Sequence, residues 1–239
     1  MKLKHRWSLV ALGCAVSALG CRPAVNSAEI AETPEGKACG PEAMIEDAED
    51  NNNQVIAQDG RGGYMYTFVD KVGSTVEPAS GESGGVFAPR PGGAQGSQYA
   101  MCMKGTVGTA AIVYTGMGLN FVDPKGQYDA TKYKGISFWA KKGPGSTGKV
   151  RLKVPDVNTD PDGQVCSECF NDFGADLTLT EEWQQFTIPF NRMKQLAGWG
   201  NPQKSSIEPA TLYGIQFQVN DKGQPYDICV DNIAFTGCP

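Results

Sequence analysis

The chain has 239 residues, with 21 basic and 26 acidic side chains and a formal net charge of −5. This acidic balance argues against nucleic acid as a partner, because phosphate binding requires a basic face. The single histidine is His5, so the rest of the chain has no Ser-His-Asp or Cys-His nucleophile, no histidine-ligated zinc and no imidazole acid-base chemistry. Any enzyme would have to work with carboxylates or a metal.

The first 20 residues have the pattern of a secretory signal. Three basic residues precede an apolar run from Leu9 to Leu19, which is too short to span a bilayer. The segment Ala18-Leu19-Gly20-Cys21 resembles a bacterial lipobox, which implies cleavage before Cys21 and lipid attachment to its thiol. Lipidation at Cys14 and an ordinary secretory signal are the alternatives. We expect a lipid-anchored protein of the bacterial cell envelope, in the outer membrane or at the cell surface.

The rest of the chain divides into a linker and a domain. Residues 21–38 are rich in Ala, Pro, Glu and Ser, which predicts a flexible tether. Residues 39–239 are enough for one domain. Loss of the signal segment with its three basic residues would leave 18 basic against 26 acidic side chains, a net charge of −8.

Alternating apolar and polar side chains predict a series of short strands in this domain. The clearest are residues 135–141, 149–154, 185–190 and 213–219. The Gly, Pro, Asp and Asn residues between them are typical of turns. Many short alternating strands favour an all-β sandwich or jelly roll. One short helix is predicted at 191–196, and a surface loop at 74–96.

Two acidic segments lie near the ends of the domain, at Met44–Asp50 and at Ile228–Phe235. They resemble the first and last strands of galactose-binding-like β-sandwiches, which include the family 11 carbohydrate-binding modules and the complex I intermediate-associated proteins. The resemblance extends loosely over residues 44–236, but Ala48 replaces the usual Phe and Cys229 stands in a hydrophobic position. It implies a jelly-roll β-sandwich whose chain ends meet. It also implies a monomer that binds a polysaccharide or glycoconjugate without catalysis.

The resemblance further implies a structural calcium ion shared by the two end strands. Asp47, Glu49 and Asp231 are the expected ligands, with backbone carbonyls completing a shell of about six to eight oxygens. The choice among the acids of the first strand, Glu46 included, depends on whether a β-bulge shifts the alternation. The alternative is that these acids are solvated at the strand ends.

A second acidic loop also has calcium-like spacing. Asn158, Asp160 and Asp162 take the first, third and fifth positions of an EF-hand-like loop, followed by Gly163. The position of the bidentate Glu is occupied by Cys169. An acidic turn held by side-chain to backbone hydrogen bonds is therefore favoured over a calcium site.

Six cysteines remain beyond Cys14 and Cys21, and an oxidising compartment favours disulfides. The fold that the resemblance implies favours the pairs Cys39–Cys238, Cys102–Cys229 and Cys166–Cys169. The second pair requires a strand at 99–104 to lie beside the last strand. For the closely spaced third pair, free thiols and half of a zinc site are the alternatives.

The alternation also predicts a binding face. With the apolar side chains in the core, one set of residues should point together from the outer face of one sheet: Trp139, Arg151, Lys153, Gln216 and Gln218. An aromatic ring covers the C–H patches of a sugar, while polar groups bind its hydroxyls. Further candidates from nearby loops are Asp156, Asn158, Asp172 and Trp199. The alternative is that loop 156–173 covers Trp139 in a second small core.

Two other functions are considered. Glu46-Asp47-Ala48-Glu49 superficially resembles the paired-acid motif of jelly-roll glycoside hydrolases, but its spacing and its position on the first strand differ. A surface or adhesion scaffold that binds another protein would instead need an exposed apolar patch.

Overall fold

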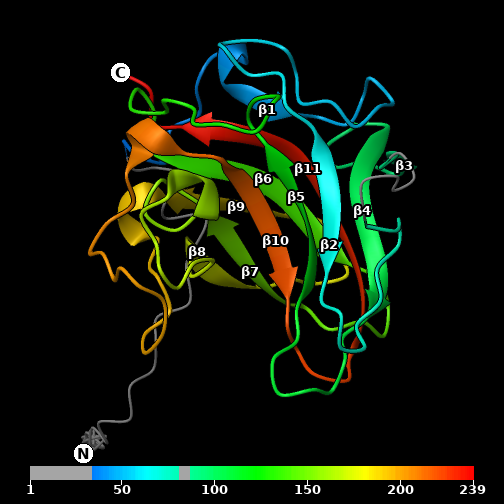
Figure 1. Cartoon of the computed structure of the whole chain (residues 1–239). Helices are drawn as coiled ribbons and strands as arrows, with labels where there is room; N and C mark the ends of the chain where they lie inside the picture. Colours follow the sequence, from blue (N-terminus) through cyan, green and yellow to red (C-terminus); the bar gives the residue numbers. More distant parts are fainter. Residues whose placement is uncertain (1–33, 81–86) are drawn as a thin grey trace, which may run out of the picture.

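The computed structural model describes residues 34–80 and 87–239, which form two packed antiparallel sheets (Figure 1). One sheet has the order β3-β4-β11-β6-β9, with β1 also paired to β11, and the other has the order β2-β5-β10-β7-β8. The strands are β1 (Met44–Glu46), β2 (Met65–Val69), β3 (Arg90–Pro91), β4 (Tyr99–Thr106), β5 (Thr115–Asn120), β6 (Gly135–Lys142), β7 (Lys149–Val154), β8 (Phe173–Thr178), β9 (Gln184–Pro189), β10 (Gly214–Val219) and β11 (Pro225–Thr236). The predicted jelly-roll β-sandwich is confirmed.

The core lies between the sheets and follows the predicted alternation. Phe138 of β6 meets Phe217 of β10 edge to face, with ring centroids 5.0 Å apart. On β10, Ile215, Phe217 and Val219 are buried, whereas Gln216 and Gln218 between them are partly exposed. The partly exposed residues therefore point away from the core, to the outer face of their sheet.

The two chain ends meet as the resemblance implied. Strand β1 pairs antiparallel with β11, with a register shift between Met44 and Glu46. A disulfide joins Cys39 to Cys238, and Ala38 forms a β-bridge with Thr236 just before it. The described fold thus begins a few residues before Cys39.

The two other predicted disulfides are also present. Cys102 on β4 is bonded to Cys229 on β11, because these strands are neighbours with the two residues in register. Cys166 is bonded to Cys169. The pairing of the segment 99–104 with the last strand is confirmed.

One predicted element is wrong. The segment 191–196 forms no α-helix: a single 3-10 turn covers Phe190–Arg192, and Lys194 then bridges to Gly174 in extended conformation. The signal segment and most of the tether, including Cys21, lie outside the described residues. Within 34–80 and 87–239, no helix is long and apolar enough to cross a membrane.

Candidate functional site

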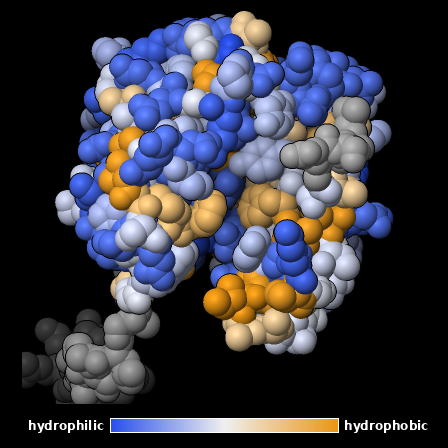
Figure 2. All heavy atoms as spheres, viewed as in Figure 1, coloured by the Kyte–Doolittle hydropathy of each residue, from blue (hydrophilic) through white to orange (hydrophobic). Residues whose placement is uncertain are grey.

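A groove of about 690 Å³ lies on the outer face of the β2-β5-β10-β7-β8 sheet. Its lining combines aromatic, aliphatic and amide side chains with a few charged ones: Tyr66, Phe68, Ala111, Ile112, Val113, Tyr114, Arg151, Lys153, Glu168, Cys169, Phe170, Asn171, Leu196, Trp199, Gln216, Gln218, Asn220 and Lys222. Figure 2 shows this face hollowed between two blocks of loops, with apolar residues gathered beside the hollow.

The floor consists of two rows of side chains that run across the strands. In one row Tyr66, Gly118, Gln216 and Lys153 lie opposite one another on β2, β5, β10 and β7. In the next row, two residues along each strand, the corresponding residues are Phe68, Gly116, Gln218 and Arg151. Because side chains alternate between faces with a period of two, both rows point to the same side.

The two glycines of β5 leave room for aromatic rings. A Cβ atom at Gly116 would lie 2.4 Å from Cζ of Phe68, and a Cβ at Gly118 would lie 3.0 Å from the hydroxyl of Tyr66. Both rings therefore lean over β5, where any larger residue would push them away. Phe68 also lies near Tyr66 and Tyr114, with ring centroids 6.3 and 6.5 Å away.

Hydrogen bonds within the floor hold the amide groups in place. Nε2 of Gln216 donates to the hydroxyl of Tyr66 over 3.1 Å, and Oε1 of Gln218 accepts from Nζ of Lys153 over 3.1 Å. Burial raises the pKa of Tyr66 to about 12, so its hydroxyl stays protonated at neutral pH. Since that oxygen accepts from Gln216, its own proton can be donated to a ligand.

The two cations of the floor are each paired with a carboxylate. Nζ of Lys153 lies 3.0 Å from Oδ2 of the buried Asp172. Arg151 donates to Oδ1 of Asp176 over 2.8 Å and to the carbonyl of Lys194 over 2.6 Å. The floor is therefore polar but close to neutral.

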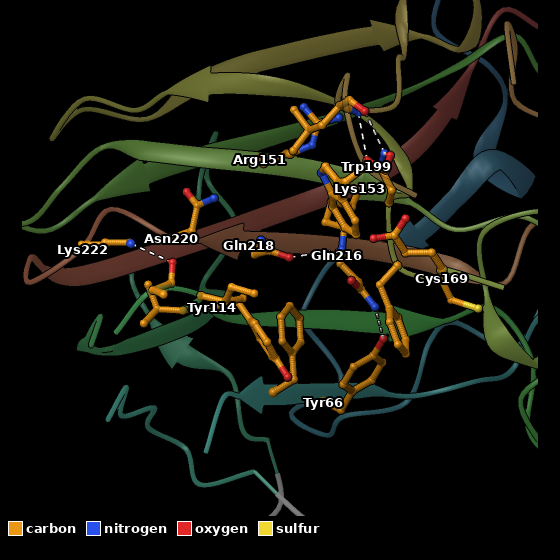
Figure 3. A pocket seen from close by; sticks show the side chains of 18 residues that line it. Tyr66, Tyr114, Arg151, Lys153, Cys169, Trp199, Gln216, Gln218, Asn220 and Lys222 are labelled. Carbon is orange, nitrogen blue, oxygen red and sulfur yellow. Dashed lines mark hydrogen bonds between the residues drawn. The ribbon is translucent and has the colours of Figure 1, made fainter. Parts of the chain in front are cut away.

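The walls of the groove come from loops at opposite ends of the strands. Phe170 precedes β8, and Trp199 belongs to a neighbouring loop; they are 58% and 39% exposed. At the other end, Tyr114 precedes β5 and Lys222 follows β10. Figure 3 shows Cys169 and Lys222 at opposite ends of the strands with Gln216 and Gln218 between them. The groove consequently runs across the strands.

Comparison with known proteins identifies the family of this fold. The sequence model of carbohydrate binding domain 30 matches residues 96–237, more than half of the chain. The chain belongs to this family. A search of curated proteins with this sequence found no match.

Solved structures of the same architecture are similar to this family 30 domain. A family 11 carbohydrate-binding module of the cellulosomal cellulase Lic26A-Cel5E of Clostridium thermocellum is 19% identical, covers 84% of this chain and 97% of its own, and gives a TM-score of 0.52. A solved family 30 carbohydrate-binding module is 13% identical and covers 78% of this chain and 95% of its own, with a TM-score of 0.47. The first likeness supports the β-sandwich fold.

The structure brings five of the sequence-predicted residues together at the groove: Arg151, Lys153, Trp199, Gln216 and Gln218. Trp139 is not among them. It lies on β6, between Asp231 and Gln185 on the neighbouring strands of the other sheet. The prediction that it shares the face of β7 and β10 is wrong, because alternation within a strand does not say to which sheet the strand belongs.

Three further predicted residues are buried instead of facing the groove. Asp156 is fully buried and accepts hydrogen bonds from the backbone of Asn158 and of Glu208. Asn158 is buried beside it, and Asp172 lies behind Lys153. Burial raises the pKa of Asp156, partly offset by these hydrogen bonds. These side chains support the loop and the floor.

Sequence reasoning missed the aromatic residues of the floor and walls, namely Tyr66, Phe68, Tyr114 and Phe170. A signal was present: residues 64–69 alternate Tyr64, Tyr66 and Phe68 with Met65, Thr67 and Val69. That alternation is typical of a strand with an aromatic outer face. Phe170 lies in an irregular loop, where no periodicity could have shown its direction.

The loop with EF-hand-like spacing is an acidic turn. The side chain of Asp160 accepts from the backbone of Asp162 and pairs with Nζ of Lys125 at 2.7 Å. The side-chain to backbone hydrogen bonds that the favoured reading predicted are therefore present. The disulfide between Cys166 and Cys169 removes the free thiols that a zinc site would need.

The expected calcium ligands are engaged with backbone groups. Oε1 of Glu49 accepts from the amides of Gln98 and Tyr99, Oδ2 of Asp231 accepts from that of Ala94, and Oδ1 of Asp47 accepts from that of Glu49. In the described part of the chain, no three acidic, histidine or cysteine side chains gather as a metal site.

Glu46, the alternative to Asp47 and Glu49 on the first strand, is the residue that most nearly fits a cation there. It is buried, and its Oε2 has no hydrogen-bond partner among the described residues. Burial raises the pKa of Glu46 to about 8, and the charges of Asp50, Asp47 and, least, Asp231 raise it further. Burial also raises the pKa of Asp231, to about 6. Two buried carboxylates near each other would be stabilised by a cation. Calcium binding stays a prediction.

Proposed function

We propose that this family 30 domain binds an uncharged polysaccharide in the groove across the β2-β5-β10-β7-β8 sheet, without cleaving it. Family membership supports carbohydrate binding in general. The groove residues support the location and the type of ligand.

The observation that carries the proposal is the aromatic floor formed by Tyr66 and Phe68 over the glycines of β5. Flat rings bind the C–H faces of sugars, and positioned polar groups beside them bind hydroxyls. Gln216 and Gln218 supply such groups and are already held by Tyr66 and Lys153. A site arranged before binding loses less conformational entropy when the ligand arrives.

The charge of the groove favours an uncharged ligand. Arg151 and Lys153 are paired with Asp176 and Asp172, so neither cation needs an anionic partner from the ligand. Nζ of Lys222 donates to the carbonyl of Ala111 at the wall. An acidic polysaccharide would have to compete with these bonds and would meet Glu168 at the rim.

The same lining argues against hydrolysis. Glycoside hydrolases use two carboxyl groups that flank the bond, about 5 to 10 Å apart. Among the described residues that line the groove, Glu168 is the one acid, and its Oε2 accepts from the amide of Gly200. Glu46, Asp47 and Glu49 belong to β1 and the loop after it, and are not part of the groove.

Affinity electrophoresis of the purified protein in gels that contain single polysaccharides tests this proposal. We expect retardation by at least one neutral polysaccharide of a panel that includes β-1,3-1,4-glucan, agarose and mannan, and none by alginate. The polysaccharide should be unchanged in length afterwards. Retardation by alginate alone would contradict the proposed ligand class, and shortened chains would indicate a hydrolase.

A protein partner is the alternative function, and one observation favours it. Ile112 and Val72 are 78% and 53% exposed, on loops joined by a hydrogen bond from the amide of Gly108 to Oγ of Ser74. Such an apolar surface is small for a stable interface. If no polysaccharide retards the protein, a substitution of Ile112 by Asp is the first variant to test in a search for partners.

We further propose that the domain is tethered to the bacterial cell envelope by a lipid on Cys21. The support is the lipobox-like segment of the sequence. Radiolabelled palmitate should be incorporated into the protein in a bacterial host, and Cys21→Ser should abolish this. Incorporation that persists in Cys21→Ser and is lost in Cys14→Ser would move the anchor to Cys14.

A further inference from the structure

The groove wall that carries Trp199 and Phe170 is joined to the Cys166–Cys169 disulfide. We propose that this disulfide is a positioning element of the carbohydrate groove, which fixes Phe170 and, through a set of hydrogen bonds, Trp199. The inference rests on the proposed function and names what holds one wall of that same site.

The two residues enclosed by the disulfide bind the loop that follows Trp199. The carbonyl of Asn201 accepts from the amides of Ser167 and Glu168 over 3.0 and 3.3 Å, and the amide of Asn201 donates to the carbonyl of Glu168 over 3.0 Å. The side chain of Asn201 donates to Oγ of Ser167 over 2.6 Å. Oε2 of Glu168 accepts from the amide of Gly200 over 2.8 Å. Five hydrogen bonds thus join the enclosed residues to the two residues after Trp199.

The loop that holds Trp199 has no regular secondary structure to fix it. It contains no strand or helix, and Gly198 and Gly200 on either side of the tryptophan have positive φ angles. The carbonyl of Trp199 does accept from Nδ2 of Asn171. Asn171 itself lies two residues after Cys169. Within the loop, Nε2 of Gln203 also donates to the carbonyl of Trp199. The hydrogen bonds that tie residues 199–201 to another segment of the chain come from residues 167–171, which begin inside the disulfide.

Phe170 depends on the same disulfide more directly. It follows Cys169 and has a φ of 71°, a left-handed conformation that is costly for a bulky side chain. Such a conformation persists where the surrounding structure determines it. Its amide donates to the carbonyl of Thr159 over 2.9 Å, and the residue is 58% exposed at the groove. The disulfide and this hydrogen bond hold the turn that presents the ring.

The short loop that the Cys166–Cys169 disulfide closes also indicates a local role. A disulfide stabilises a protein more when it closes a longer loop. Cys166 and Cys169 are three residues apart, whereas the other two disulfides span 127 and 199 residues. The short ring should add least to global stability, and Cys169 itself lines the groove. Its main effect is expected on the wall.

The test compares the double variant Cys166→Ser/Cys169→Ser with the wild-type protein on the neutral polysaccharide that binds it. We expect roughly tenfold weaker binding, as when an interface aromatic loses its position. In protein labelled with 5-fluorotryptophan, the ¹⁹F resonance of Trp199 should shift or broaden while that of Trp139 stays unchanged. The matched control Cys102→Ser/Cys229→Ser, in the other sheet, should keep the affinity and the Trp199 resonance.

The same cysteine substitutions in a protein that lacks both wall aromatics distinguish positioning of those aromatics from a general structural effect. When Trp199→Ala and Phe170→Ala are already present, removal of the disulfide should cause no further loss of affinity. A full additional loss, or wild-type affinity in the cysteine variant, would overturn the inference. If the cysteine variant does not fold, Asn201→Ala decides: it should weaken binding and broaden the Trp199 signal, and unchanged affinity would count against the inference.

Failure of the inference and failure of the proposed function give different results. If Phe68→Ala weakens binding and neither the cysteine variant nor Asn201→Ala does, the groove binds sugar but the disulfide does not position its wall. If no polysaccharide binds the wild-type protein, both the function and the inference are overturned.

Discussion

The groove depends on individual residues whose neighbours hold them before any ligand arrives. Tyr66 and Phe68 lean over β5 because Gly116 and Gly118 have no side chains. Gln216 is then held by the hydroxyl of Tyr66. Side chains that need not be ordered on binding contribute more of their contact energy to affinity. The smallest residues of the site therefore matter as much as the aromatic ones.

Phe68→Ala should weaken polysaccharide binding by about tenfold or more, because the loss of a central aromatic contact is typical of a binding hot spot. Trp139→Ala is the matched control, since it removes an aromatic ring from the outer face of the other sheet. Isothermal titration calorimetry on both variants measures the effect. Loss of binding in Trp139→Ala with full binding in Phe68→Ala would place the site on the other sheet.

Gly118→Ala should weaken binding without unfolding the protein. Its new Cβ would lie 2.9 Å from Cγ of Gln216 and 3.0 Å from the hydroxyl of Tyr66, so this hydrogen-bonded pair must move. The Cβ would also lie 2.8 Å from the backbone carbonyl of Ile215, which must shift, so the variant should lose some stability as well. Gly126→Ala is the control, because its nearest neighbour would be 3.5 Å away. Equal affinities of both variants, measured by calorimetry, would show that the pair is not part of the site.

At the scale of elements, a charged cluster joins two loops to the start of the sandwich. Asp59 accepts hydrogen bonds from Lys132, Tyr128 and Tyr133 at 2.6, 2.7 and 2.8 Å. Arg61, beside it, donates to the carbonyl of Met44 at the start of β1. Burial alone would raise the pKa of Asp59, but the hydrogen bonds from Lys132, Tyr128 and Tyr133 outweigh it and hold that pKa well below its usual value.

A lowered pKa in the folded state makes the cluster sensitive to acid. The charged Asp59 contributes stability above its unfolded pKa of about 3.9, and this contribution is lost as the pH falls toward the folded pKa. Asp59→Asn should therefore be clearly less stable than wild type at about pH 6, with a smaller difference at about pH 3. Urea unfolding of both proteins at the two pH values measures it. A difference that stays constant or grows in acid would contradict the proposed role of the charge.

The sequence predicted elements best where alternation is strong. Strands β6, β7, β9 and β10 lie within one or two residues of their expected ranges. Strand β5, Thr115–Asn120, was missed because Gly116 and Gly118 replace the outer residues and its whole length is buried. The two glycines that let aromatic rings lie over β5 are thus also the residues that remove the alternation by which a strand is predicted.

The candidate site was predicted only in part, for a different physical reason. Alternation within β7 and β10 shows that Arg151 and Gln216 face away from the core, but strand order decides which residues share a face. Trp139 also alternates with core residues, but its strand belongs to the other sheet. The order β2-β5-β10-β7 is formed by contacts between distant segments, and no local pattern of a single sequence contains it.

At the scale of the whole molecule, the two chain ends hold the sandwich together. Strand β1 lies on β11, and the Cys39–Cys238 disulfide closes a loop with a sequence separation of 199 residues. In the chain-entropy model a loop of this length is worth about 5 kcal/mol, against about 2 kcal/mol for the ring of Cys166 and Cys169. The buried acids Glu46 and Asp231 lie at this same junction. A cation there would add to the tie between the ends.

Calcium should therefore raise the thermal stability of the domain. A cation in 100-fold excess over its Kd stabilises by about 2.7 kcal/mol, which corresponds to roughly 5 to 10 °C in Tm for a chain of this size. Differential scanning calorimetry with calcium and with a chelator measures the shift.

Asp231→Asn and Glu46→Gln should abolish the calcium-dependent shift in Tm, because each removes a buried charge that the cation would neutralise. Glu181→Gln, at the exposed partner of Lys142, should leave it intact. A calcium shift that survives in Asp231→Asn would place the ion elsewhere, and no shift in the wild-type protein would mean that protonation of Glu46, and not a cation, relieves the charge at the junction.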